Sequence, residues 1–436
     1  MTIATDDPYS ASRLGFSGDR TVRSALFLAT FLLIWLTANP FPDLSDPKVL
    51  EPVGEGNFLG QTLALILTAS MAAFVLLSDA RLLLLKNLTP LLLLTLFWFS
   101  LSAAASAEPF LASRRLVLAA ITIFQASTFL LLPADREHFG RLLAIGALAI
   151  LALCYAGVVF APELSIHQAS DLQEPELAGD WRGAFGHKNG AGAAMAVLVF
   201  VGIFVFRSCS SILGALIVVL ATVFLAFTRS KSPMWLLPCV FFMTPFILAS
   251  RRAGIKAVFA LGLPIIISVL TIGSVSSDAI GTMVHNLLSD PTFTGRNVIW
   301  RFTLDHIAQR PILGYGFQAF WGTSELKSAW SYLESWGYRA SDAHNSYLNV
   351  AVMTGVVGLV LAMLWTLVQP LKDHLAVQRR GDGDSALNTM LMQAWLFGLC
   401  ISGFESVLFD GGNVIWFMML LATAGFRYQA IAKLTR

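Results

Sequence analysis

The stretch at residues 294–316 reads TGRNVIWRFTLDHIAQRPILGYG. It lies inside residues 277–345, the one long polar interruption in a chain that otherwise consists of hydrophobic runs. Thr294 can cap a helix here. Four apolar residues then fall on one face of that helix: Val298, Ile299, Phe302 and Ile307. Such an amphipathic helix is expected to lie along a membrane surface and not to cross the membrane.

Composition decides the class of protein. Hydrophobic residues make up 56% of the 436 positions and charged residues only 13%, so we predict a polytopic membrane protein. The formal net charge of +2 is too small to indicate nucleic-acid binding. The cysteines show no CxxC spacing, which predicts neither a disulfide framework nor a thiolate metal site. The polar N-terminal segment lacks a cleavage site, so the first span is expected to stay as a signal anchor.

The hydrophobic runs predict an all-α fold, because a helix needs about 20 apolar residues to cross a bilayer. We expect about 12 transmembrane helices, near residues 24–41, 57–78, 88–104, 115–133, 141–161, 188–206, 211–228, 232–249, 254–275, 346–370, 388–404 and 411–430. They divide the chain into a bundle at 1–276 with spans 1–9, a loop at 277–345 with short amphipathic helices, and spans 10–12 at 346–436. The pair at 211–228 and 232–249 has the shortest connection and is the least certain.

The positions of Lys and Arg predict the orientation, because basic residues near span ends stay on the cytoplasmic side. Most of those in short connections fall on one side if the N-terminus is inside, and acidic residues gather on the other side. Arg114 and Arg115 are among the few basic residues assigned to an outer connection. This distribution predicts that both termini are cytoplasmic and that the long loop lies outside.

The basic residues that break this pattern carry the functional signal. They map to the outer face, at or just beyond the ends of spans: Arg182, His187, Lys188, Arg229, Lys231, Arg296 and His344. If the helices pack as a bundle, these side chains converge on one rim. A cationic rim at the outer membrane surface suits an anionic, lipid-borne ligand, since guanidinium groups pair bidentately with phosphate oxygens.

Two segments of this rim allow more than one interpretation. Residues 180–192 read DWRGAFGHKNGAG, where the glycines and Asn189 either leave backbone amides free for a ligand or form an ordinary helix cap. Arg182 opposes the topology rule, which favours a functional role. In the turn between two spans, Arg229 and Lys231 either reach the ligand or extend to lipid headgroups.

His344 lies directly before the span at 346–370. Imidazole accepts a proton near neutral pH, so His344 is a candidate general base for a hydroxyl group, although a lone histidine is usually just a hydrogen-bonded residue. Glu405 and Asp410 flank the last outer turn and either orient a base or acceptor or serve as interfacial carboxylates. Arg296 lies in the first turn of a predicted helix, where the dipole disfavours a cation, and this favours function. No further histidine or carboxylate motif accompanies His344, so we expect no metal.

Several motifs occur in a recognisable order along the chain. They are Arg182-Gly183-x-Phe185-x-x-Lys188-Asn189, Gly295-Arg296 with Trp300, Pro311-x-x-Gly314-Tyr315-Gly316, His344-Asn345-x-Tyr347-Leu348 and Gly355-x-x-Gly358-Leu359. Together they resemble the O-antigen ligase and polymerase superfamily of bacterial inner-membrane proteins. The sequence FGHKN at 185–189 is most similar to that of exopolysaccharide repeat-unit polymerases.

The resemblance implies a glycosyl transfer in the periplasm, without metal or cofactor, from a glycan on undecaprenyl diphosphate. By position, it implies that Arg182 and Arg296 hold the diphosphate and that His344 activates the acceptor hydroxyl. The family often has Arg where this chain has Lys231, with Arg229 two residues earlier, so which of the two serves stays open.

The remaining expected site residues are Lys188 on the donor side and Asn189, Asn345, Tyr347 and Glu405 in support. The bilayer and the lipid-linked glycan are the expected partners, with a flippase or chain-length regulator as possible assembly partners.

Three functions stay open. The first is a polymerase that extends lipid-linked repeat units, and the second is a ligase that moves a finished glycan to lipid A core or protein. The third is a transporter of lipid-linked sugars. Transporters tend to have ionisable residues near the midplane, whereas here the candidate cations lie at one rim, which favours surface chemistry.

Overall fold

A computed structural model of the chain describes residues 20–36, 39–47, 58–78, 80–287, 290–321, 341–381 and 385–431. The polar N-terminal segment and residues 322–340 of the long loop lie outside the described residues. The described parts consist of helices, connections and one isolated antiparallel bridge between Ile166 and Trp181, so the all-α prediction is confirmed.

The helices follow one another along the chain in this order: α1 (Arg20–Leu36), α2 (Phe58–Leu76), α3 (Ala80–Asn87), α4 (Pro90–Ala104), α5 (Pro109–Phe129), α6 (Arg136–Phe160), α7 (Pro162–Ser165), η3 (Pro175–Leu177), α8 (Lys188–Ser208), α9 (Ser211–Thr228), α10 (Lys231–Ala249), α11 (Ala253–Ser276), α12 (Asp278–Leu287), α13 (Arg296–Gln309), α15 (Ser346–Met363), the π-helical turn η6 (Leu364–Val368), α16 (Gln369–Arg380), α17 (Ser385–Ile401) and α18 (Val414–Ile431).

The helices account for every predicted hydrophobic run. Within the described residues, nine helices are long and apolar enough to cross a membrane, and α3 with α4, bent by 63°, can form a tenth span. The two other expected positions hold α1 and α17, each of 17 residues. The polytopic membrane architecture is thus confirmed, while the count of about 12 spans stays a prediction.

One boundary prediction was wrong. The span expected at 115–133 is α5, which begins at Pro109, a residue whose ring favours the first turn of a helix. Arg114 and Arg115 therefore lie within this helix and not in an outer connection. Arg115 donates to the carbonyl oxygen of Gln318 and Arg114 to Gln61 Oε1 at 3.2 Å. These acceptors let an apolar helix carry two cations near its end.

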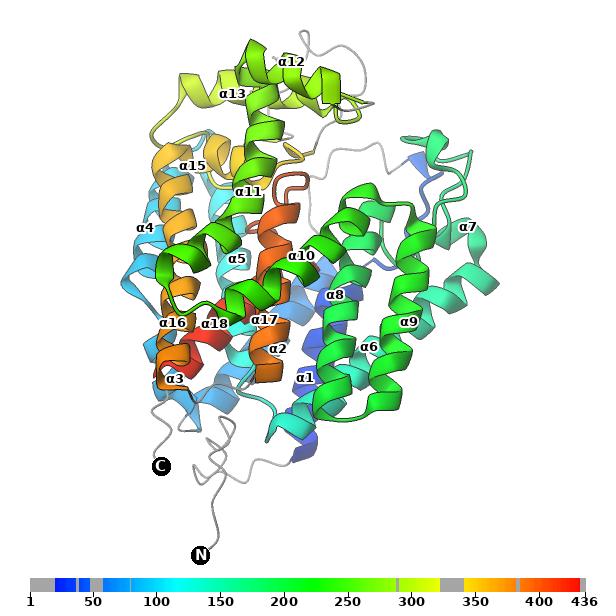
Figure 1. The fold of residues 1–436 in the computed structure, drawn as a ribbon, viewed down its shortest axis with the longest axis vertical. Coiled ribbons are helices and arrows are strands. Elements are labelled where there is room, and N and C mark those ends of the chain that lie inside the picture. The colour runs from blue at the N-terminus through cyan, green and yellow to red at the C-terminus, as the bar shows by residue number, and fades with distance from the viewer. Residues whose placement is uncertain are drawn as a thin grey trace, which may run out of the picture.

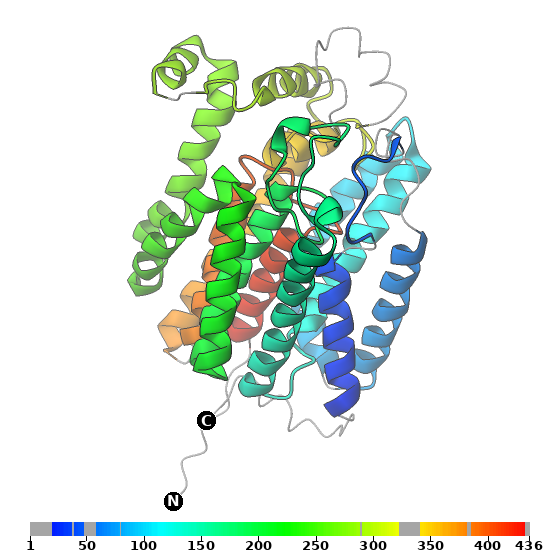
Figure 2. The same cartoon turned by 90° about the vertical axis from the view of Figure 1, so that its right-hand side faces the viewer.

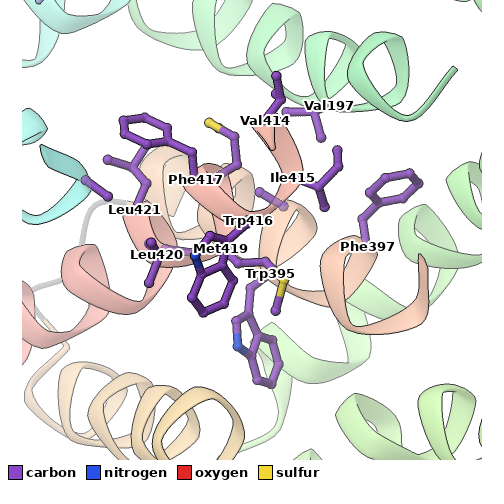
Figure 3. Packing of buried hydrophobic residues seen from close by; sticks show 14 of the residues in the cluster. Val197, Trp395, Phe397, Val414, Ile415, Trp416, Phe417, Met419, Leu420 and Leu421 are labelled. Carbon is purple, nitrogen blue, oxygen red and sulfur yellow. The ribbon is translucent and has the colours of Figure 1, made fainter. Parts of the chain in front are cut away.

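The centre of the bundle is formed by α8, α17 and α18. In both α8 and α18, 78% of the spanning window is buried, compared with 11% in α2 and 22% in α11. Figure 3 shows how the side chains of α18 pack against Trp395 and Phe397 of α17 and Val197 of α8. The outer helices keep their apolar residues exposed, as expected for surfaces that contact lipid.

The long loop lies at one end of the bundle. Figure 1 shows α12 and α13 lying across that end, above α11 and α15. Figure 2 shows the connections at 162–187 and 39–47 at the same end. The start of α1 and the end of α18 lie at the opposite end (Figures 1 and 2). The polar connections that carry the candidate residues are therefore gathered on one side.

A break in α15 anchors the loop to the bundle. Gly355 has φ 73° and ψ 174° inside the helix, so the preceding turn loses its regular hydrogen bonds. Tyr315 N–H donates to Val352 O at 3.0 Å, and Gly316 N–H donates to Met353 O at 2.9 Å. A Cβ at position 355 would lie 1.8 Å from the carbonyl oxygen of Ile312. The glycine-containing motif at 311–316 in the loop therefore packs directly against the one that begins at Gly355 in α15.

The surface helix α13 differs from the prediction in detail. Its N-cap is Gly295, with φ 80°, and not Thr294, because Thr294 itself has a left-handed backbone with φ 60°. Its buried residues are Ile299, Trp300 and Thr303, whereas Val298, expected on the apolar face, is 44% exposed. The large Trp300 indole decides the rotation, since it packs in a separate small core between α13 and the start of α15.

Candidate active site

Glu405, in the connection between α17 and α18, is the meeting point of the site. Its Oε1 accepts hydrogen bonds from Asn189 Nδ2 at 3.0 Å and from Arg296 Nη2 at 2.9 Å. Its Oε2 lies 3.5 Å from His344 Nδ1. Arg296 also donates to the carbonyl oxygen of Phe404. One carboxylate therefore joins the start of α8, the start of α13 and the segment before α15.

The backbone around His344 is fixed from both sides. Trp300 of α13 donates its indole N–H to Ala343 O at 3.0 Å, so the helix that carries Arg296 also positions His344. The His344 N–H donates to Asp342 Oδ1 at 2.6 Å, and its φ of 46° is left-handed. Such a backbone conformation is uncommon outside glycine and occurs often at functional sites.

Asn345 and Tyr347 hold the start of α15. Asn345 caps the helix, because its Oδ1 accepts from the Tyr347 N–H at 3.1 Å, and its Nδ2 donates to Gly403 O at 3.1 Å. Tyr347 donates its hydroxyl to Leu399 O at 2.7 Å. Both side chains thus tie the His344 segment to α17 and to the connection that carries Glu405.

The electrostatics of this pair favour charge on both partners. Burial lowers the pKa of His344, but the carboxylates of Asp342 and Glu405 outweigh burial and raise it above its usual value. Burial raises the pKa of Glu405, but Arg296 and His344 outweigh that effect and hold it well below its usual range. The imidazole is therefore a stronger base than a free histidine.

The basic turn between α9 and α10 separates its two cations. Arg229, with a left-handed backbone and a 70% exposed side chain, donates to Asp180 Oδ1 at 3.2 Å. Lys188 contacts the other oxygen of Asp180 at 2.6 Å, so these two cations share one carboxylate. Ser230 between the basic residues donates to Asn189 Oδ1 at 3.0 Å, which links the turn to the Glu405 group.

Lys231 lies on the other side of this turn, exposed at the first position of α10. Its positive charge reaches Asp290, just before α13. The hydrogen bond from the Thr292 hydroxyl is the main cause that lowers the pKa of Asp290, and Lys231 adds to it. The charge of Lys231 thus acts on the loop before α13, whereas Arg229 is paired with Asp180 in the connection at 162–187.

Arg182 has a different environment from the one expected. Its side chain is completely buried, and it donates to Pro42 O at 2.8 Å and to Phe185 O at 3.2 Å. Its own backbone N–H donates to Ser165 O at 2.9 Å. In this arrangement Arg182 ties its own connection at 162–187 to the connection at 39–47, and its hydrogen bonds go to these backbone carbonyls and not to Glu405. A role for Arg182 on the diphosphate stays a prediction.

Several residues of the site were not found from the sequence. In the sequence, Ser230 and Asp180 look like ordinary loop residues. They belong to the site because Ser230 contacts Asn189 and Asp180 contacts Lys188 and Arg229. Asp342 could have been found, because an Asp two positions before a histidine can bond that backbone N–H. Within the described residues, no group of three or more His, Cys, Asp or Glu side chains is arranged to hold a metal ion.

A cavity of about 440 Å³ lies next to the site, on the side of α11. Tyr347, three positions after His344, forms part of its wall. The rest of the wall is mainly apolar: Leu261, Pro264, Ile265, Ser268, Val269, Ile272, Gly273, Ile280 and Leu367. Ile265 and Val269 are also 57% and 45% exposed on the outside of the bundle. An apolar space therefore lies along the spanning helix α11, with Tyr347 as the site residue in its wall.

The sequence comparisons agree with the resemblance. Residues 194–363 match the model of the protein family described as O-antigen ligase. This region includes Lys231, Arg296 and His344, whereas Asn189 and Glu405 lie outside it. The exopolysaccharide production protein ExoQ of Rhizobium meliloti (strain 1021) is 32% identical over 74 residues, which cover 16% of this chain and 17% of that protein. The resemblance to this family is confirmed over the matched residues.

Proposed function

We propose that the protein is a glycosyltransferase of the bacterial inner membrane that polymerises undecaprenyl-diphosphate-linked repeat units into exopolysaccharide or O-antigen. Both termini would be cytoplasmic and the site would face the periplasm. The contacts of Glu405 carry the proposal, because one carboxylate brings together Arg296, a cation for the diphosphate, and His344, a proton acceptor. The match to the O-antigen ligase family supports it.

In the proposed step, the acceptor hydroxyl oxygen bonds to the anomeric carbon of the donor sugar. The bond between that carbon and the diphosphate oxygen breaks, and the diphosphate leaves with the electron pair. His344 takes the hydroxyl proton, for which its raised pKa suits it. This single displacement needs one base, and it inverts the configuration at the anomeric carbon.

The leaving diphosphate needs fixed positive charge. Arg296 uses Nη1 and Nη2 to contact Phe404 and Glu405, and its remaining N–H groups can reach a phosphate. Lys231 is exposed beside the same loop and adds a second charge, whereas Arg229 and Lys188 are already paired with Asp180. We therefore assign the diphosphate to the space between Arg296 and Lys231.

The apolar cavity fits the isoprenoid tail of the same donor. Tyr347 is part of its wall, and most of the other lining residues lie on the membrane-spanning helix α11. A lipid whose diphosphate lies at Arg296 would place its hydrocarbon chain there without covering the site from outside. This arrangement allows substrates to enter from the bilayer.

A ligase is the second candidate, because O-antigen ligase is the description of the matching family. The two functions share the donor chemistry and differ in the acceptor. Loss of a polymerase in cells should leave single repeat units on the carrier, whereas loss of a ligase should leave long carrier-linked polymer.

The direct test uses purified protein in lipid nanodiscs with a lipid-linked repeat unit as both donor and acceptor. The wild type should form new glycosidic linkages, and His344→Ala should form none although it inserts and purifies normally. His285→Ala, an exposed residue of α12, is the matched control and should behave as the wild type. Normal polymer length from His344→Ala would refute the assignment, and movement of lipid without linkage would indicate a transporter.

A further inference from the structure

His187 caps α8 and has both ring nitrogens in use. Its Nδ1 accepts from the Asn189 N–H at 3.1 Å, and its Nε2 lies 2.8 Å from Glu174 Oε2. A backbone N–H can only donate, so Nδ1 must be unprotonated in this structure. Nε2 then carries the proton and donates it to the carboxylate. The partners thus select the neutral imidazole with its proton on Nε2.

This cap is the outer end of a continuous chain of contacts. From His187 the path leads through Asn189, whose side chain donates to Glu405 at 3.0 Å, and on to His344, 3.5 Å from the other oxygen of Glu405. Ser230, in the turn just before α10, donates to the Asn189 side chain and holds it in place. The amide group of Asn189 does not titrate near neutral pH, so His187 is the residue that can take up a proton at the outer end of this path.

We propose that His187 is a positioning residue, which in its neutral form orients Asn189 and through it Glu405 and His344, and which releases them when Nδ1 is protonated. The inference rests on the proposed function, because His344 is the group that is positioned. Protonation would place an N–H against the Asn189 N–H, and two donors cannot share one hydrogen bond. The first turn of α8 would then lose its cap and Asn189 its fixed position.

Three charged or titratable groups lie around His187. Glu174 contacts its Nε2, and the hydrogen bond from His187 is the main cause that lowers the pKa of Glu174. The ring centroid of His167 lies 5.3 Å away, and Lys188 is the next residue in the chain. His167 and Lys188 each have a carboxylate partner of their own: His167 contacts Asp171 at 2.8 Å, and Lys188 contacts Asp180 at 2.6 Å.

The first test measures the rate of linkage formation against pH with the purified protein. In the wild type, two protonations, at His344 and His187, should make the acid limb of the kcat profile approach a slope of two. His187→Asn keeps a capping oxygen that cannot be protonated, so its slope should fall to about one and its rate at pH 8 should stay within about threefold of the wild type. His187→Ala should lose about tenfold in kcat at pH 8 with little change in KM.

Three results would overturn the inference: an acid limb of His187→Asn as steep as that of the wild type, a rate of His187→Asn as low as that of His187→Ala, or a rate of His187→Ala equal to the wild type. His285→Ala serves as the control for replacing an exposed histidine. Failure of the proposed function is separate, because it appears as a lack of linkage formation by the wild type itself.

The second test needs no activity. Hydrogen–deuterium exchange of the first turn of α8 is measured from about pH 8 to about pH 5 and corrected for the intrinsic rate at each pH, and in the wild type its protection should be lost on acidification. His187→Asn should keep its protection over this range. Equal protection in the two proteins at every pH would overturn the inference whatever the reaction catalysed.

Discussion

Replacing Glu405 by Gln removes the negative charge that faces His344 Nδ1 and keeps the size of the side chain. The carboxylate raises the pKa of His344, so the substitution should lower that pKa. The base acts only when unprotonated. The pH at which activity falls by half on acidification should therefore move downward, while the maximal rate should fall because the imidazole is less basic and less firmly oriented.

The geometry sets the size of the shift. Two unit charges 3.5 Å apart in a medium of effective dielectric constant near 20 interact by about 5 kcal/mol, which is an upper limit of about 3.5 pKa units. The His344 and Glu405 side chains keep 29% and 20% of their surface exposed, and Asp342 remains beside the ring. Solvent screening therefore reduces the expected shift to about one unit. Loss of orientation should lower kcat about tenfold to a hundredfold.

The assay is the initial rate of linkage formation from pH 5 to pH 9, with thermal unfolding to verify that Arg296 is still held. Glu176→Gln, which changes an exposed carboxylate on the same side of the bundle, is the matched control. An acid limb of Glu405→Gln at the same pH as that of the wild type would refute the assignment of His344 as the base. A shift toward higher pH would contradict the electrostatic argument.

Three further results are expected. Gly355→Ala should lower the free energy of unfolding by about 3 kcal/mol or more, because its φ is 73° and its Cβ would meet a carbonyl oxygen, whereas Gly262→Ala, with open space around it, should have little effect in the same thermal scan. Lys231→Ala should raise KM for the lipid-linked donor about tenfold and Arg229→Ala much less, and the reverse order in steady-state kinetics would assign the diphosphate to Arg229. The pKa of Glu405 is depressed in the folded protein, so its stabilising effect is fully present above the ordinary glutamate pKa of about 4.3 and is lost as the pH falls toward the folded value of about 2. Thermal unfolding of Glu405→Gln should lack this loss.

Much of the fold could be predicted because the membrane imposes one simple requirement. Every apolar run long enough to span a bilayer contains a helix, and α13 forms where a polar loop shows helical periodicity. The prediction failed where a local rule met a tertiary contact. Arg115 was assigned to an outer connection, but it lies inside α5, where it donates to the carbonyl oxygen of Gln318 in the loop. Thr294 was expected to cap α13, but Gly295 takes that position.

The candidate site was predictable only in part, for a related reason. Lys231, Arg296 and His344 were expected to converge on one rim, with Asn189 and Glu405 in support. The structure joins Arg296, His344 and Asn189 through Glu405, whereas Lys231 lies exposed at the first position of α10. Arg182 was expected with them on the same grounds of charge and topology, yet it lies buried against backbone carbonyls. A basic residue at an outer span end can face a ligand or support a loop, and charge alone does not distinguish the two.

The sequence by itself predicted a polar loop at 277–345 that carries Arg296 and His344, and the described parts of this segment lie at one end of the bundle (Figure 1). The length of a hydrophobic run and the positions of its flanking charges are properties of a single segment, so they can be read from the sequence alone. Only the tertiary structure decided that Glu405, which is 216 residues away from Asn189 in the chain, contacts Asn189, Arg296 and His344 together. Directional hydrogen bonds between distant segments depend on how the helices pack, and no local pattern records that packing.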